Sequence, residues 1–146
     1  MQKMLHGTSS EKAALIVREG FLPTSYFTTS VDDAMFYATT GGEEDLQARE
    51  EQWEEDNGYP PREEYGSDTL SMMQDLYPDG QHPVIIEVLI PDELVARATI
   101  DTGAEGALCF SQRLPSDIVT RVIEIDWEKA CLGSYNPLNG AAVPTV

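Results

Sequence analysis

The sequence of 146 residues predicts a single α+β domain with a mostly antiparallel or split β-sheet. Three observations predict this class. Two strand–helix pairs open the chain, an irregular acidic segment follows, and four strand-like segments with little helix between them close it. Doubly wound parallel folds instead alternate strands and helices along the whole chain. We therefore expect residues 1–146 to form one unit with one core and an acidic insertion at about residues 43–82.

The first half of the chain contains the two strand–helix pairs. Residues 2–6 predict a short strand, and Thr8-Ser9-Ser10-Glu11 has the spacing of a capping box for a helix that ends at Gly20. Residues 26–28 predict a second strand, and Ser30 is expected to cap a second helix. Apolar residues recur in this second helix at helical spacing, which predicts a buried face: Val31, Ala34, Met35 and Ala38.

The acidic segment separates these pairs from the later strands. Residues 43–68 contain eleven acids and two bases. We expect a solvated helix over residues 43–56 with Trp53 as its large apolar anchor, then a mobile loop, then a short helix near residues 70–77.

The second half of the chain is rich in strand patterns. Residues 83–91 are apolar on both faces, which predicts a central strand. A helical turn is expected at residues 92–95. Three further strands are expected at residues 96–100, 107–110 and 119–127.

The composition argues against several classes of function. Twenty-six acids against nine bases give a formal net charge of −17. This charge disfavours direct nucleic-acid binding, which needs a basic patch. It permits a protein partner with a basic surface or imitation of nucleic acid, with simple solubility as the alternative role of the acids. No run of roughly 18 apolar residues is present, so no membrane span is expected. The two cysteines and the absence of a signal-peptide pattern favour the cytoplasm. No spacing of histidine and cysteine fits a metal site, so no metal is expected.

The residues that carry chemistry lie in two short blocks, at residues 5–9 and 26–30. In the first block, His6 and Gly7 end a strand, and a glycine lets a ligand approach its backbone N–H and C=O groups closely. In the second block, Tyr26 offers an aromatic face that suits a flat cationic ring. Hydroxyl groups available to the same pocket belong to Thr8, Thr28 and Ser30, with helix capping as the alternative role of Thr8 and Ser30.

These blocks, together with the helix that carries Ala34, Tyr37 and Ala38, resemble the NAD-binding half of the ADP-ribosyltransferase superfamily. The similarity is to the diphtheria-toxin and PARP-type branch, which has a His–Tyr–acid triad. It covers residues 3–38 and extends weakly over residues 83–127, whereas the acidic segment has no counterpart. The resemblance implies split antiparallel sheets with short helices around a cleft for NAD.

The resemblance also implies roles for individual residues. His6 would hydrogen-bond the NAD ribose, the Gly7 backbone would contact the carboxamide of nicotinamide, and Tyr26 would stack on the nicotinamide ring. The residues implied to contact NAD are His6, Gly7, Thr8, Tyr26, Phe27, Thr28, Ser30 and Tyr37.

The third element of the family is an acid at the start of a late strand, which stabilises a transition state with developing positive charge. Glu105 is the first candidate and Asp101 the second. Glu87 is a third candidate, for which a paired, partly buried charge is the alternative role. Gly106 stands directly before the strand, where the family acid often lies, so the identity of the acid stays open.

The implied activity is mono-ADP-ribosyl transfer, in which NAD is cleaved and ADP-ribose passes to a macromolecular target. Small acidic chains of this kind occur among phage proteins that disable host defences, including anti-CRISPR proteins, and bacterial toxins are the other group implied. The resemblance thus implies a basic, nucleic-acid-binding host protein, such as a CRISPR effector, as the target. Arginine specificity is disfavoured because no Gln/Glu-x-Glu motif is present. RNA 2′-phosphotransferase activity is disfavoured because bases are scarce near the expected cleft.

Two alternatives stay open. The first is a binding protein without catalysis, whose acidic surface imitates nucleic acid and covers a basic partner. The second is an NAD glycohydrolase, in which water accepts the ADP-ribose.

Overall fold

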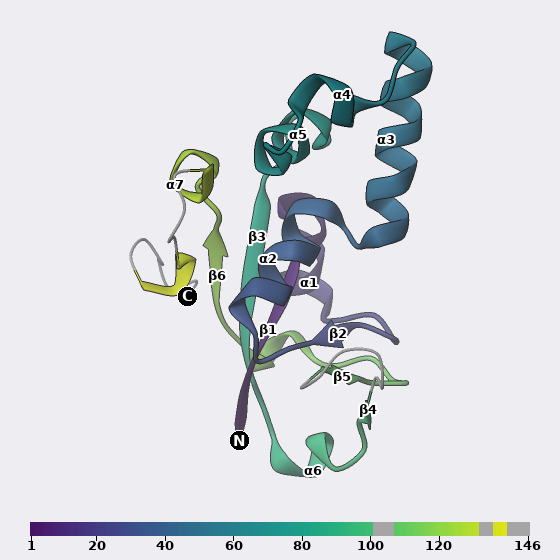
Figure 1. Ribbon diagram of the computed structural model, residues 1–146. Helices are drawn as coiled ribbons and strands as arrows, with labels where there is room; N and C mark the ends of the chain where they lie inside the picture. Colours follow the sequence, from purple (N-terminus) through teal and green to yellow (C-terminus); the bar gives the residue numbers. More distant parts are fainter. Residues whose placement is uncertain (101–106, 132–135, 140–146) are drawn as a thin grey trace.

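The computed structural model describes residues 1–100, 107–131 and 136–139, and it has an α+β architecture with two antiparallel sheets (Figure 1). The strands are β1 (Gln2–Ser9), β2 (Tyr26–Phe27), β3 (Pro83–Ile90), β4 (Thr99–Ile100), β5 (Leu108–Cys109) and β6 (Val119–Glu124). The α-helices are α1 (Ser10–Glu19), α2 (Val31–Thr40), α3 (Glu43–Asn57), α4 (Pro61–Tyr65), α5 (Thr69–Leu76), α6 (Asp92–Val95) and α7 (Trp127–Cys131). Two short 3₁₀ helices are η1 (Ser116–Ile118) and η2 (Pro137–Asn139).

The larger sheet has the order β1-β3-β6, so β3 is its central strand, as the sequence predicted. In the antiparallel register, Leu5 lies opposite Glu87 and Gly7 lies opposite Ile85. Strand β1 runs on to Ser9 instead of ending at His6, so both chemistry-bearing residues of the first block lie within the sheet.

Both faces of this sheet are buried because side chains alternate along each strand. Met4, Val84 and Ile86 pack with α1 and with three phenylalanines on one face. Leu5 and Ile85 pack with α2 on the other face. His6 therefore lies on the α1 face, and its neighbours Leu5 and Gly7 lie on the α2 face. The phenylalanines are Phe21, Phe27 and Phe110.

The smaller sheet has the order β2-β5-β4 and joins the larger one through a backbone bridge. Leu5 N–H donates to the Thr28 carbonyl at 2.8 Å, and Thr28 N–H donates to the Leu5 carbonyl at 2.9 Å. This pair of hydrogen bonds places the end of β2 directly beside β1, although the two segments are more than twenty residues apart in sequence.

The acidic segment forms a packed helical arm of α3, α4 and α5 at the end of β3 that carries Pro83 (Figure 1). The predicted mobile loop is wrong for residues 61–65, which form α4 with Pro61 at the first helical position. The ring of Trp53 contacts those of Tyr59 and Tyr65, and Arg62 pairs with Glu50 at 2.7 Å. These contacts stabilise the arm, and no local apolar periodicity in the sequence predicts them.

The predicted last strand is also too long. Strand β6 ends at Glu124, and Trp127 begins α7 instead of extending the strand. The carboxylate of Asp126 accepts a hydrogen bond from the Lys129 backbone at 3.2 Å, which is the contact of a helix cap. Every helix in the described part of the chain is too short or too polar to cross a membrane.

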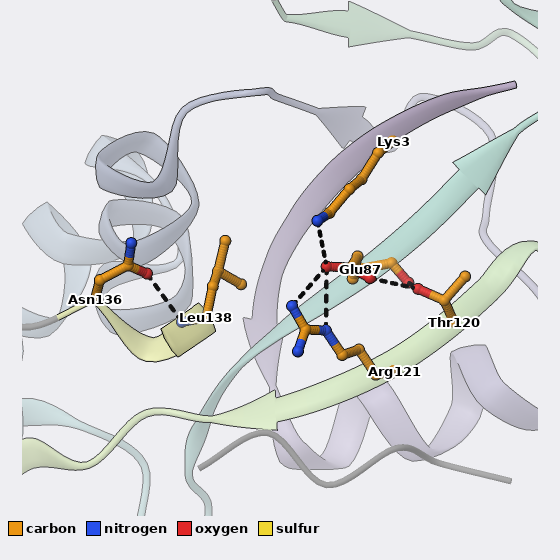
Figure 2. A network of polar contacts seen from close by, with 6 residues as sticks. All are labelled: Lys3, Glu87, Thr120, Arg121, Asn136 and Leu138. Atoms are coloured by element: carbon orange, nitrogen blue, oxygen red, sulfur yellow. Dashed lines mark hydrogen bonds and ion pairs between the residues drawn. The ribbon is translucent and has the colours of Figure 1, made fainter. Parts of the chain in front are cut away.

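Glu87 on the central strand is the hub of a polar network on the α2 face (Figure 2). Its carboxylate accepts bonds from Arg121 at 2.9 and 3.1 Å and from the Thr120 hydroxyl at 2.9 Å, and Lys3 lies 3.3 Å away. Burial raises the pKa of Glu87, but the bonds from Arg121, Thr120 and Lys3 together hold it below its ordinary value. Glu87 is therefore a structural charge, paired across three strands.

Replacing Glu87 with glutamine is expected to lower the free energy of unfolding by about 2 kcal/mol at pH 7, because Arg121 and Lys3 lose their partner. Because the pKa of Glu87 in the folded protein is lower than its ordinary value of 4.5, the ionised carboxylate stabilises the fold fully above pH 4.5. This stabilisation is lost as the pH falls through the pKa of the folded state. Urea unfolding should thus show a wild-type advantage at pH 7 that shrinks at pH 3. Glu124→Gln, an exposed change on β6, is the control, and an equal loss in both variants would contradict the assignment.

Candidate functional site

A cavity of about 890 Å³ opens beside the last residues of β1. This volume is in the range typical of sites for small molecules and cofactors, about 300–1,000 Å³. One face of α1, residues 22–28, Tyr37 of α2 and the start of α3 are also part of its lining. Residues 5–9 of the first block and residues 26–28 of the second block, which the sequence analysis placed at 26–30, therefore line one cavity.

His6 is held in place by contacts from the second block. Its Nδ1 lies 2.7 Å from the carbonyl oxygen of Tyr26. Its ring packs against Phe21 and Phe27, with ring centroids 5.3 and 5.5 Å away. The backbone of Tyr26 and two core rings thus fix the imidazole at the cavity wall.

The surroundings of His6 decide its protonation. Burial lowers the pKa of His6 below its ordinary value, the hydrogen bond to Tyr26 opposes this, and the charge of Lys12 lowers the pKa further. The imidazole is therefore neutral at pH 7. Because a carbonyl oxygen only accepts hydrogen bonds, Nδ1 carries the proton and Nε2 is left as an acceptor. An acceptor of this kind suits a sugar hydroxyl.

Gly7 has a different role on each of its two sides. A Cβ at this position would overlap the backbone oxygen of Ala34 and lie 2.8 Å from the backbone nitrogen of Ala38. The missing side chain thus makes room for α2, and not for a ligand as the sequence suggested. The backbone N–H and C=O groups of Gly7 have a separate role from its missing side chain. Leu5 bonds to Thr28 on the side away from β3, and Gly7, two residues later, faces the same way. Within the described residues no backbone group bonds to Gly7 from this side.

Tyr26 and Tyr37 present two nearly parallel rings at the cavity. Their planes differ by 6° and their centroids lie 6.5 Å apart. A flat ring between them needs about 3.5 Å on each side, or about 7 Å in all. Tyr26 is 43% exposed and Tyr37 is 37% exposed, so both residues are reached from solvent. The sequence marked both residues as contacts of the cofactor, but it did not predict that their rings face each other.

Local structure explains why these two rings are exposed. In β2, alternation sends Phe27 into the core and leaves Tyr26 on the cavity side. In α2, Ala34 and Ala38 form the buried stripe, and Tyr37 lies off it. Both rings are thus presented by regular secondary structure, which limits how far they move.

The hydroxyl residues of the two blocks have mainly structural roles. Thr8 is buried in β1 and is not the helix cap, because the Ser9 hydroxyl accepts the Lys12 N–H at 3.3 Å. The Thr28 hydroxyl accepts from the Ser30 N–H, and the Ser30 hydroxyl caps α2 by accepting from Asp33. Thr8, Phe27 and Thr28 line the cavity, whereas Ser30 does not.

Of the three candidate acids, the structure describes only Glu87. Asp101 and Glu105 lie outside the described residues. Glu87 lies on the opposite face of the sheet from His6, and its network occupies its carboxylate, so it is not available to the cavity. Among the described residues, the carboxylates that line the cavity are Glu11, Glu19, Asp33 and Asp45.

The expectation that bases are scarce near the cleft is wrong. Lys12, Arg49 and Arg113 all line the cavity, although the chain has only nine basic residues. Arg49 comes from the acidic arm, and its long side chain reaches the ring of Tyr77, 5.3 Å from the centroid. Sequence distance concealed this, because Arg49 lies far along the chain from the blocks at residues 5–9 and 26–30.

The neutral state of His6 gives a pH prediction. If Nε2 accepts a hydrogen bond from substrate, nicotinamide release from NAD should be level from pH 8 to about 6.5 and fall only at lower pH, because the folded pKa lies below the ordinary 6.5. His6→Ala should lower the rate throughout and remove this acid limb. His82→Ala, at an exposed turn, should keep the limb, and loss of the limb in this control would refute the role of His6.

No group of three potential metal ligands comes together within the described ranges. Comparison of the chain with known protein families, with characterised proteins and with solved structures finds no match.

Proposed function

We propose that the protein is a mono-ADP-ribosyltransferase that cleaves NAD and transfers ADP-ribose to a macromolecule. One observation carries the proposal. Two parallel tyrosine rings, an open glycine backbone edge and a histidine fixed as a hydrogen-bond acceptor all line one cavity. Together these groups suit a flat cationic ring, a primary amide and a sugar hydroxyl, which are the parts of a nicotinamide nucleotide.

Each residue then has a defined task. Tyr26 and Tyr37 hold the nicotinamide ring between their faces, and stacking plus the charge of the ring favours this position. The Gly7 N–H donates to the carboxamide oxygen, and the Gly7 carbonyl accepts from the amide nitrogen. His6 accepts a ribose hydroxyl proton through Nε2. Tyr26 acts twice, because its carbonyl also orients His6.

The step itself breaks the bond between the ribose anomeric carbon and the nicotinamide nitrogen, and nicotinamide leaves with the bonding electrons. Positive charge develops on the ribose, and a nearby carboxylate stabilises it. We assign this role to Glu105, with Asp101 as the second candidate. An acceptor group of the target then bonds to the anomeric carbon and loses a proton.

The acid is tested by single substitutions. Glu105→Gln is expected to lower nicotinamide release at least about 100-fold, since it removes charge stabilisation of the transition state. Asp101→Asn should then have a small effect, and the reverse pattern would transfer the role to Asp101. Release of nicotinamide from NAD is followed by chromatography. If His6→Ala, Glu105→Gln and Asp101→Asn all keep the wild-type rate, the proposed site is wrong.

The same assay separates the three activities. Rapid nicotinamide release without any protein acceptor indicates a glycohydrolase, whereas transfer of label from NAD to a target indicates a transferase. Inhibition of a basic partner that persists without NAD indicates a non-catalytic mimic.

We also propose that the target has a basic surface. The exposed face of α3 carries many of the acids of the chain, including Glu51, Glu54 and Glu55, and such a surface attracts a basic protein. Association driven in this way should weaken as salt rises. Capture of a target from host lysate at low salt and its loss at high salt would support this choice of partner.

A further inference from the structure

The cavity has a basic component that the nicotinamide site does not explain. Lys12 lines it from α1, and Arg49 lines it from α3. Acids outnumber bases 26 to 9 in this chain, so a basic side chain has many possible carboxylate partners. Lys3, Arg18, Arg62 and Arg121 each pair with one. Within the described residues, no ion pair holds Lys12, Arg49, Arg97, Arg113 or Lys129, and of these five Lys12, Arg49 and Arg113 line the cavity.

Lys12 is placed at a position that costs stability. It lies in the first turn of α1, where the helix dipole is positive and a cation is unfavourable. No ion pair joins Lys12 to the adjacent Glu11, whose carboxylate accepts a hydrogen bond from Gln81 at 2.8 Å. Burial and, to a smaller extent, the Lys12 charge lower the pKa of His6, so this charge acts on the imidazole of the site. Lys12 is exposed, so its ammonium group is available to an anionic ligand in the cavity.

Arg49 is held in position but has donors to spare. Its guanidinium donates to the Thr39 carbonyl at 3.4 Å and lies over the ring of Tyr77. One of its five N–H donors is thus used in the described structure. Glu50, the next residue on α3, pairs with Arg62 and not with Arg49. Arg113, the third base of the cavity, differs, because it donates to the Glu19 carbonyl at the end of α1.

We propose that Lys12 from α1 and Arg49 from α3 bind the diphosphate of the substrate, so that the protein selects a dinucleotide over the pyridine nucleoside alone. This inference rests on the proposed function for the identity of the substrate. A lysine supplies a point charge and an arginine supplies a planar fork, and both suit phosphate oxygens. A diphosphate entering a chain with a net charge of −17 is repelled overall, so local cations are needed to offset that field.

The test measures binding of ADP-ribose, nicotinamide riboside and NAD by calorimetry. Lys12→Ala and Arg49→Ala are each expected to weaken ADP-ribose and NAD about tenfold and to leave nicotinamide riboside within about twofold. Arg49→Lys keeps the charge and should lose less than Arg49→Ala. The matched controls are Arg18→Ala on α1 and Arg62→Ala on the arm, with circular dichroism to verify folding.

A variant that is expected to increase the affinity for ADP-ribose makes the test more specific. Asp45 lines the cavity one helical turn before Arg49, and no ion pair joins the two. Asp45→Asn removes a negative charge from that wall and should tighten ADP-ribose about two- to threefold. A general loss of folding in the variants cannot produce such a gain.

Two results would overturn the inference. One is wild-type protein that does not bind ADP-ribose, and the other is Lys12→Ala and Arg49→Ala variants that lose no more affinity than the Arg18 and Arg62 controls.

The proposed function is refuted by different results. If ADP-ribose binds through Lys12 and Arg49 but NAD is not cleaved, the diphosphate site stands and the transferase does not. If a variant that combines Lys12→Ala and Arg49→Ala cleaves NAD with an unchanged KM, the transferase stands and the diphosphate site is wrong.

Discussion

Replacing Tyr26 or Tyr37 with alanine is expected to weaken NAD binding by about 30- to 100-fold. Each ring supplies stacking worth about 1 kcal/mol and a cation–π attraction worth up to about 2 kcal/mol when desolvated. The two losses should not add, because a ring that has lost one wall stacks less firmly on the other. Titration of NAD against each single variant and the double variant measures this.

Conservative variants separate stacking from folding. Tyr37→Phe keeps the ring and should bind NAD within about threefold of wild type. Tyr59→Ala removes a tyrosine of similar exposure that lies on the arm, and it should leave NAD affinity unchanged. If Tyr26→Ala and Tyr37→Ala both bind NAD with wild-type affinity, no ring binds between Tyr26 and Tyr37.

Replacing Gly7 with alanine is expected to lower the free energy of unfolding by about 3 kcal/mol. The new methyl group would overlap the Ala34 carbonyl oxygen and crowd Ala38, and both contacts are with backbone, which no side-chain rotation relieves. Strand β1 and helix α2 must then separate, which opens the core cluster around Leu5 and Ile85. Chemical denaturation measures the loss.

The same substitution should also reduce activity in the molecules that stay folded. Tyr37 lies on α2, so a shift of this helix moves its ring relative to Tyr26. Gly58→Ala is the control. Nothing lies within 4 Å of a Cβ there, so only its left-handed backbone conformation opposes the change, at about 1 kcal/mol. Equal destabilisation by the two substitutions would show that α2 does not pack against Gly7 as described.

Most secondary structure of this protein is predictable because the signals are local. Ser30 caps α2 and Gly20 ends α1, since a hydroxyl or a glycine acts within one helical turn. The central position of β3 follows from apolar residues on both of its faces. The errors fall where distant contacts decide. Helix α4 depends on the packing of Tyr65 against Trp53, and the end of β6 depends on a cap by Asp126.

The site divides in the same way. The sequence by itself determined that His6, Gly7 and Tyr26 belong to short strand segments, because residue type and strand alternation are local properties. Only the tertiary structure decided that the Tyr26 carbonyl fixes His6, that Gly7 makes room for α2, that Tyr37 faces Tyr26, and that Lys12 and Arg49 enter the same cavity. Each of these facts joins segments that are separated along the chain, and pairings of that kind are set by how the sheets and helices pack.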